Sequence, residues 1–347
     1  MTKRKEKILT SLLAMALAAP LAVGGLPSVY AEGLQGYEAR GESYQDMEIS
    51  NGTYLSDDGE NVNNSLPTYQ NRAASSEELS GGERARKINY SLPPVSNKSI
   101  YSYQKISASL GGINLGREAI RINDIYYLPV RASFAALGAS VSYSSATRTI
   151  TVRMKGLTLT ATDGAYVVYA NDRPLFNFSP AVVMSNGRMY IPASTVAKAL
   201  GLSMSTSGGV LLSGSVNPLK PASQYYREDE VLWLGRIIMA EAGGESLLGQ
   251  IAVGDVILNR VKSSQFPNTI WGVIFDKRYG IQFSPVANGT IYNSPSFTAT
   301  LAAKICLEGV SLSDNAMYFL NPRIAHSSWI VNNRPYAYTI GNHDFYL

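Results

Sequence analysis

Residues 231–245 repeat apolar side chains at helical spacing and then break at two glycines. Val231, Leu234 and Ile238 recur every three or four residues, which predicts one buried face of a helix. Gly243-Gly244 follows at once, and glycine readily takes the left-handed conformation that ends many helices. A chain with this pattern is expected to fold around a buried helix that stops at these glycines.

Glu241 occupies the last turn of this predicted helix, on or beside the apolar face. Burial and the negative end of the helix dipole both disfavour a carboxylate, so we expect the pKa of Glu241 to be raised. A carboxylic acid that stays protonated near neutral pH is suited to protonating a glycosidic oxygen. Periodicity alone also allows Glu241 to lie in water beside the apolar face, or to pair with Arg236 or Arg260.

Further sequence blocks accompany this helix in a fixed order. They are Ala240-Glu-Ala-Gly-Gly-Glu245, Gly249-Gln-Ile-Ala-Val-Gly254, Val256-Ile-Leu-Asn-Arg-Val261, Phe266-Pro267, Gln282-Phe-Ser-Pro-Val286 and Tyr318-Phe-Leu-Asn-Pro322. Through these blocks the segment from residue 228 onward resembles the catalytic domain of the SleB/CwlJ cell wall hydrolases, the spore cortex-lytic enzymes. Several blocks in order are much more specific than any single motif.

The resemblance implies an α+β protein with a lysozyme-like, lytic-transglycosylase-like C-terminal catalytic domain, in which Glu241 is the catalytic residue. In that chemistry one glutamate protonates the oxygen between N-acetylmuramic acid and N-acetylglucosamine. The same carboxylate then accepts the proton of the muramic C6 hydroxyl as an anhydro ring closes. The resemblance and the residue types further indicate a set of substrate-binding candidates: Gln282, Ser284, Tyr318, Asn321 and Trp329. Each of these also has a local alternative, either backbone hydrogen bonding or core packing.

Two features of the first block bear on this expectation. Gly243 stands where members of the family often carry a bulkier residue, which is expected to loosen the turn. Glu245 is the nearest second carboxylate, and we expect the glycines to turn it away from Glu241, toward the start of the next helix. A glycosidase that uses water would instead need a pair of suitably spaced carboxyl groups.

Local patterns predict the remaining elements of residues 222–347. The expected elements are a helix over 246–262, a strand or helix at 271–275, a hairpin over 282–291 turning at Asn288-Gly289, a helix from Ser294 to Gly309 with Pro295 in its first turn, a strand at 315–321 and a closing strand over 340–346. Cys306 falls in an apolar run and is expected to be a core thiol.

Residues 100–215 contain an internal repeat. The segment 122–138 recurs as 185–201, with Pro129 matching Pro192 and Leu137-Gly138 matching Leu200-Gly201. Each unit predicts a strand that ends at proline, a short helix and a glycine cap, so we expect a small α+β module. The module resembles the copper amine oxidase N-terminal-like domain, which implies a spacer or wall-associated role. The chain has two histidines and both lie outside the module, so a copper site is not expected there.

The N-terminal residues indicate export. Residues 1–31 read as a signal peptide, with basic residues at 3–7, an apolar run over 8–26 and a small-x-small cleavage site at 29–31. An uncleaved anchor is the alternative. Residues 32–99 are rich in Gly, Ser, Asn and Glu and predict a disordered linker. We therefore expect a secreted protein of the cell wall or spore envelope, on a Gram-positive exterior.

Composition and motifs exclude several functional classes. A formal net charge of +4 is too small to argue for nucleic acid binding. Two histidines without paired spacing disfavour a metal centre, and the chain lacks the Gly-x-Ser-x-Gly motif of serine hydrolases. The prediction is a monomeric, cofactor-free, peptidoglycan-degrading enzyme whose accessory partner, if any, is left open. An N-acetylmuramoyl-L-alanine amidase and a non-catalytic wall-binding protein are the alternatives.

Overall fold

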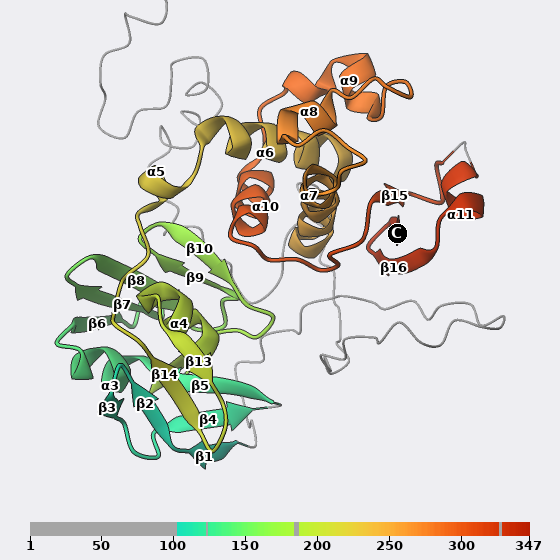
Figure 1. Cartoon of the computed structure of the whole chain (residues 1–347). Helices are drawn as coiled ribbons and strands as arrows, with labels where there is room; N and C mark the ends of the chain where they lie inside the picture. Colours follow the sequence, from blue (N-terminus) through green and yellow to red (C-terminus); the bar gives the residue numbers. More distant parts are fainter. Residues whose placement is uncertain (1–102, 123, 184–186, 326–327) are drawn as a thin grey trace, which may run out of the picture. The chain divides into compact units, whose positions relative to one another are not determined.

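The computed structural model describes residues 103–122, 124–183, 187–325 and 328–347 (Figure 1). The predicted signal peptide and linker, the first three residues of the predicted module and His326 lie outside these residues. Helices and strands both occur throughout the described part, so the predicted α+β class is confirmed. Among the described helices, none has both the length and the apolarity needed to cross a bilayer.

The repeat module, defined here as β1 to β14, consists of three antiparallel or mixed sheets and two short helices. The first sheet has the order β1 (Gln104–Ile106), β4 (Ala119–Ile122), β5 (Ile125–Pro129), β12 (Met189–Pro192) and β11 (Val182–Val183). The second has the order β10 (Arg173–Phe176), β9 (Val167–Ala170), β8 (Leu157–Thr162), β7 (Thr149–Met154) and β6 (Ser140–Ser144). The third has the order β13 (Ser203–Ser205), β14 (Val210–Ser213), β2 (Ala108–Leu110) and β3 (Ile113–Asn114). The helices are α3 (Val130–Ala136) and α4 (Ala193–Leu200).

The two repeat units meet along one antiparallel strand pair. Each unit has the predicted form, because β5 ends at Pro129 and leads into α3, while β12 ends at Pro192 and leads into α4. In the pairing, Pro129 lies opposite Tyr190 and Pro192 lies opposite Tyr127, so the units are related in register. Gly201 ends α4 with a φ of 64°, and a Cβ there would lie 2.4 Å from the carbonyl oxygen of Asn217. Glycine is therefore required where the chain turns back over the helix.

Three helices form the centre of the C-terminal domain, which we define as residues 228–347. They are α6 (Glu228–Ala242), α7 (Leu247–Lys262) and α10 (Phe297–Leu307), and they pack against one another (Figure 1). Gly254 of α7 permits a close approach, since a Cβ there would lie 2.8 Å from the Cys306 sulfur and 2.9 Å from Ile238 Cδ1. Cys306 is buried, as predicted for a core thiol, and its sulfur contacts the carbonyl oxygen of Ile251 at 3.4 Å.

A three-stranded sheet closes this domain. Its order is β15 (Tyr318–Leu320), β17 (His343–Tyr346) and β16 (Tyr336–Ile340), with every pair antiparallel. The predicted single strand over 340–346 is therefore wrong. Gly341, with a φ of 57°, begins a turn that folds β17 back onto β16. The short helix α11 (Trp329–Asn333) connects β15 to β16.

Two other local predictions are corrected by the structure. The segment 282–291 is not a hairpin but a helix, α9 (Ser284–Asn288), followed by the 3-10 turn η2 (Thr290–Tyr292). Gly289 has a φ of 84° and caps α9, so the Asn-Gly pair serves as a helix end rather than a strand turn. Helix α10 begins at Phe297, because the Ser296 hydroxyl caps it by accepting from the Ala299 amide; Ser294 and Pro295 precede it. The ambiguous run near residue 271 is helical, as α8 (Ile270–Ile274).

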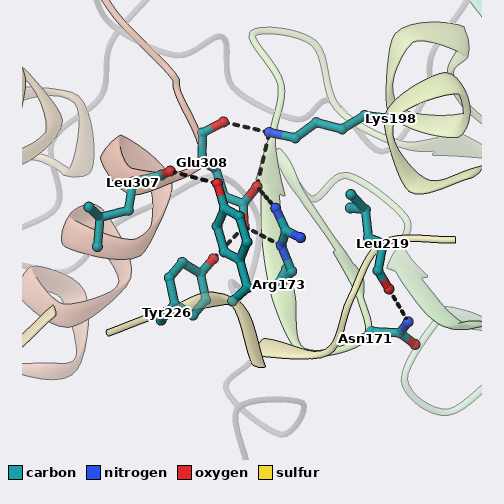
Figure 2. A network of polar contacts seen from close by, with 8 residues as sticks. Asn171, Arg173, Lys198, Leu219, Tyr226, Leu307 and Glu308 are labelled. Atoms are coloured by element: carbon teal, nitrogen blue, oxygen red, sulfur yellow. Dashed lines mark hydrogen bonds and ion pairs between the residues drawn. The ribbon is translucent and has the colours of Figure 1, made fainter. Parts of the chain in front are cut away.

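A buried polar network joins β10 to the end of α10 (Figure 2). Arg173 of β10 donates to both carboxylate oxygens of Glu308, at 2.7 Å and 2.9 Å. Lys198 of α4 lies 3.0 Å from the same carboxylate, and the Tyr226 hydroxyl donates to it at 2.5 Å. Tyr225 is the last residue of the short helix α5 (Ala222–Tyr225), and its ring centroid lies 3.3 Å from the guanidinium carbon of Arg173. The strand and the helix end are thus held together by the almost fully buried Arg173–Glu308 ion pair.

Candidate active site around Glu241

Glu241 lies in the last turn of α6, where it is partly buried. The helix ends at Ala242 as predicted, but Gly243 has helical angles (φ −59°, ψ −30°), so the left-handed glycine expected there is wrong. A Cβ on Gly243 would lie 2.6 Å from the Met239 carbonyl oxygen. Glycine is therefore needed here because the chain leaves the helix close to its preceding turn, and a bulkier residue would have to move it.

Burial raises the pKa of Glu241 to about 7, and the positive charge of Arg260 acts in the opposite direction. At neutral pH the carboxyl group is therefore divided between its acid and its ionised forms. Of the two arginines that the sequence offered as partners, Arg260 is the one whose charge acts on Glu241. The Arg236 guanidinium lies over the Trp233 ring, 4.8 Å from its centroid.

Arg260 projects from α7 into a ring of aromatic side chains. Its guanidinium carbon lies 5.0, 5.3 and 5.4 Å from the ring centroids of Phe266, Phe283 and Tyr318. Its Nε donates to the Met317 carbonyl oxygen at 2.7 Å, which anchors the guanidinium at the start of β15. Desolvation lowers the pKa of Arg260 to about 10, so it remains positively charged at neutral pH.

Two more polar residues of α7 hold the same segment in place. Asp255 accepts hydrogen bonds from the Leu312 and Ser313 amides, at 2.9 Å and 3.1 Å. Asn259 donates to the carbonyl oxygens of Ser313 and Ala316 at 2.6 Å and 3.1 Å. The polar side of α7 thus binds the backbone of 312–317 and fixes where Tyr318 emerges. The sequence alone does not show which backbone groups these side chains bind, because those groups lie more than 50 residues further along the chain.

Tyr318 and Trp329 lie together, and they extend outward from Arg260. Their ring centroids are 6.3 Å apart, and the Arg334 guanidinium lies over both rings, at 4.4 Å and 5.4 Å from the centroids. Trp329 is 52% exposed, whereas Arg260 is 6% exposed. Aromatic faces of this kind bind sugar rings well. The structure therefore places Tyr318 against Arg260, whose charge acts on Glu241, and Trp329 against Tyr318. A role of these two residues in substrate binding stays a prediction.

The contacts described for Gln282 and Asn321 are local. Gln282 is exposed, and its side chain donates to the Gly280 carbonyl oxygen at 3.1 Å. Asn321 organises the turn after β15, because its side chain accepts from the Arg323 amide at 3.0 Å. Ser284 is the exposed first residue of α9. For these three candidates a role in substrate binding stays a prediction.

The Glu245 carboxylate binds the turn between β16 and β17. Its carboxylate accepts from the side chain and the amide of Asn342 at 2.9 Å and 3.2 Å, and lies 3.6 Å from His343 Nδ1. The expected capping of α7 by Glu245 is wrong, since the Ser246 hydroxyl accepts from the Gly249 amide. Glu245 is thus an acidic neighbour of His343 although it is distant in sequence, and burial lowers the pKa of this histidine.

Comparison with known families decides what this fold belongs to. Residues 244–346 match the family model described as Cell Wall Hydrolase. Residues 244–346 are a cell wall hydrolase domain. Residues 113–210 match the copper amine oxidase N-terminal domain, as the repeat predicted. The cell wall hydrolase match begins three residues after Glu241, so the assignment of Glu241 depends on the surrounding geometry and on the block that contains it.

Named relatives of the cell wall hydrolase domain agree with this assignment. A spore cortex-lytic enzyme of Bacillus cereus is 42% identical over 120 residues, and one of Bacillus subtilis strain 168 is 39% identical over 120 residues. Each match covers 35% of this chain, with 45% of the first protein and 38% of the second. The chain therefore matches less than half the length of these relatives.

Solved structures of similar domains exist as well. The catalytic domain of SleB, a germination-specific lytic transglycosylase of Bacillus anthracis, is 42% identical, with 97% of that chain and 35% of this one covered and a TM-score of 0.33. The catalytic domain of the Bacillus cereus SleB protein is 41% identical, with 92% of that chain covered and a TM-score of 0.32.

Proposed function

We propose that this protein is an exported enzyme that cleaves the glycan strands of peptidoglycan as a lytic transglycosylase, with Glu241 as its acid and then its base. Its substrate is the bond between N-acetylmuramic acid and N-acetylglucosamine in the spore cortex or cell wall. The proposal extends to the whole chain what its relatives' names describe, namely lysis of the spore cortex and lytic transglycosylation.

The observation that carries the proposal is the raised pKa of the Glu241 carboxyl group. Burial raises its pKa to about 7, so near neutral pH one population holds a proton to donate and the other can accept one. A lytic transglycosylase requires both abilities of a single residue. Glu245, the next carboxylate along the sequence, is hydrogen-bonded to Asn342, which is consistent with a reaction that uses one carboxyl group.

The reaction then follows in two proton transfers. Glu241 gives its proton to the glycosidic oxygen, the bond from that oxygen to the muramic C1 breaks, and the N-acetylglucosamine end leaves as an alcohol. The muramic C6 hydroxyl attacks C1 and closes a 1,6-anhydro ring, while its proton passes to the Glu241 carboxylate. The carboxyl group is thereby restored to its starting form, and no water is consumed.

Tyr318 and Trp329 supply the surface along which the glycan would lie. Their rings are in contact, and Trp329 presents half of its surface to solvent. Stacking on exposed aromatic rings is a common way for proteins to bind sugars, because the ring faces are apolar and rigid. We place the strand so that it runs from these rings toward Glu241.

The test is mass spectrometry of the products formed from purified spore cortex and from vegetative peptidoglycan. We expect the wild type to release anhydro-muropeptides, one water lighter than hydrolysis products, and Glu241→Gln to release none. Glu228→Gln, an exposed change at the start of the same helix, is the matched control and should retain activity. Freed stem peptides on intact glycan would indicate an amidase, and the proposal would fail. Binding to both substrates without any product would favour a wall-binding protein.

A further inference from the structure

Arg260 is a buried cation whose hydrogen bonding is incomplete. It is 6% exposed, and its Nε is engaged with the Met317 carbonyl oxygen. Its Nη1 is fully buried and has no hydrogen-bond partner among the described residues. A guanidinium has five N–H donors, and leaving one of them unpaired in the interior is costly. Such an N–H group is expected to gain a hydrogen-bond acceptor in another state of the protein.

The charged and titratable groups that act on Arg260 narrow the choice of that partner. They are Glu241, Asp276 and Tyr318. The Asp276 carboxylate is bound by Arg278 at 2.8 Å, and the Tyr318 ring faces Arg260 as an aromatic surface. Glu241 is the remaining group, and it is also the one whose charge changes during the proposed reaction.

We propose that Arg260 is a positioning residue that holds the Glu241 carboxylate once its proton has passed to the glycosidic oxygen. The inference rests on the proposed function and assigns a second residue to the same site. The buried Nη1 would donate to the newly formed carboxylate, which then lies in the orientation needed to accept the proton of the C6 hydroxyl. Only a hydrogen bond forms in this step, and the positive charge of Arg260 is unchanged.

The surroundings of Arg260 suit this role. The bond from Nε to Met317 and the three aromatic rings fix the plane of the guanidinium before substrate arrives, so little reorganisation is needed when charge develops. Met317 directly precedes Tyr318, so the same contact that anchors Arg260 also places the proposed sugar-binding ring. Arginine presents its N–H groups in a fixed plane, whereas lysine would supply the same charge on a single flexible ammonium group.

The first test is the pH dependence of the maximal rate of product release by the full chain, for Arg260→Met, Arg260→Lys and the wild type. Removing the positive charge should raise the pKa of Glu241, so we expect Arg260→Met to move the alkaline limb upward by ~1 pH unit and to lower the maximal rate at least about tenfold. Arg260→Lys should keep the alkaline limb near its wild-type position. Arg334→Met is the matched control, because Arg334 also stacks on Tyr318 but its charge is not among those that act on Glu241.

The second test does not depend on activity. The carboxyl carbon of Glu241, assigned by comparison with Glu241→Gln, is titrated by NMR in the wild type and in Arg260→Met. We expect the same upward shift of about one unit. An unchanged titration midpoint, with only the melting temperature lowered, would overturn the inference and leave Arg260 a structural residue. A shifted midpoint in a protein whose Glu241→Gln variant still makes anhydro products would instead remove the proposed function.

Discussion

Arg173 and Glu308, 135 residues apart in sequence, form a two-bond ion pair in which both side chains are almost fully buried (Figure 2). Lys198 and Tyr226 complete the coordination of the same carboxylate. Ion pairs of this kind contribute little net stability compared with apolar packing, but the loss of one partner leaves the other charge stranded. The pair therefore fixes how β10 meets the end of α10.

Glu308→Gln should destabilise the protein by about 3 kcal/mol, because Arg173 would keep its buried charge without a carboxylate. The measurement is urea unfolding of the full chain at pH 7. Glu118→Gln is the matched control, since Glu118 pairs with Arg188 at an exposed site and its loss should change little. Equal losses of unfolding free energy for the two substitutions would show that the buried Arg173–Glu308 pair matters no more for stability than the exposed pair.

The same carboxylate should make the protein sensitive to acid. Burial alone would raise the pKa of Glu308, but hydrogen bonds from Arg173 and Tyr226 and the charge of Lys198 outweigh burial and hold the pKa below its usual value. Its contribution to stability is then fully present above the unfolded pKa of ~4.3 and is lost as the pH falls through the folded pKa. The stability difference between wild type and Glu308→Gln should therefore shrink between about pH 5 and pH 3. A difference that stays constant over this range would contradict the pKa shift.

Glu241 should have the opposite effect on stability. Because its pKa is raised to about 7, ionisation of Glu241 disfavours the folded state, and this penalty grows as the pH rises from the unfolded value to the folded one. Glu241→Gln should match the wild type near pH 4 and exceed its stability by about 3 kcal/mol near pH 8. Chemical unfolding at the two pH values checks this. A variant that is equally stable at both would mean that Glu241 is well solvated.

Gly341→Ala should disrupt the contact between the last hairpin and the start of α7. A Cβ at this position would lie 1.9 Å from Glu245 Oε2, in addition to the strain of a φ of 57°. Gly289→Ala is the control, because Gly289 has a φ of 84° but open space around it. We expect the control to cost about 1 kcal/mol and Gly341→Ala to cost clearly more. Adding Glu245→Ala should remove much of the excess, and its failure to do so would place the clash elsewhere.

Trp329→Ala should weaken binding to peptidoglycan without changing the pH dependence of the reaction. The control is Trp271→Ala, because Trp329 and Trp271 are similarly exposed, at 52% and 55%. Trp271 packs against Phe275, whereas Trp329 packs against Tyr318. Co-sedimentation with insoluble peptidoglycan gives the apparent affinity, and we expect about a fivefold or larger loss for Trp329→Ala alone. Equal losses for both variants would mean that the aromatic rings act only as a general apolar surface.

Sequence patterns predicted the helices and strand ends that depend on residues close together in the chain. Helical spacing located α6 and α7, and the repeated proline marked where each strand of the module passes into its helix. The prediction of a hairpin over 282–291 failed because the same dipeptide is common in two different structures. Asn288-Gly289 is a common hairpin turn and also a common helix cap, and only packing around α9 decides between them.

The candidate site was predictable in part for a related reason. The place of Glu241 in α6 and its raised pKa could be anticipated from the apolar face and the helix end. The contact of Glu245 with Asn342 could not, because the two residues are 97 positions apart and no local pattern links them. The sequence offered Arg260 only as a possible partner of Glu241, because its aromatic surroundings come from three separate segments.

The strand order β15-β17-β16 places the last strand of the described chain in the middle of its sheet. A ribosome makes β15 and β16 first, and neither can pair with its neighbour in this sheet until His343–Tyr346 has been made. The turn that Glu245 binds directly precedes this strand. The sheet therefore cannot form until β17 has been made, and a chain interrupted before His343 would leave β15, which carries Tyr318, and β16 unpaired.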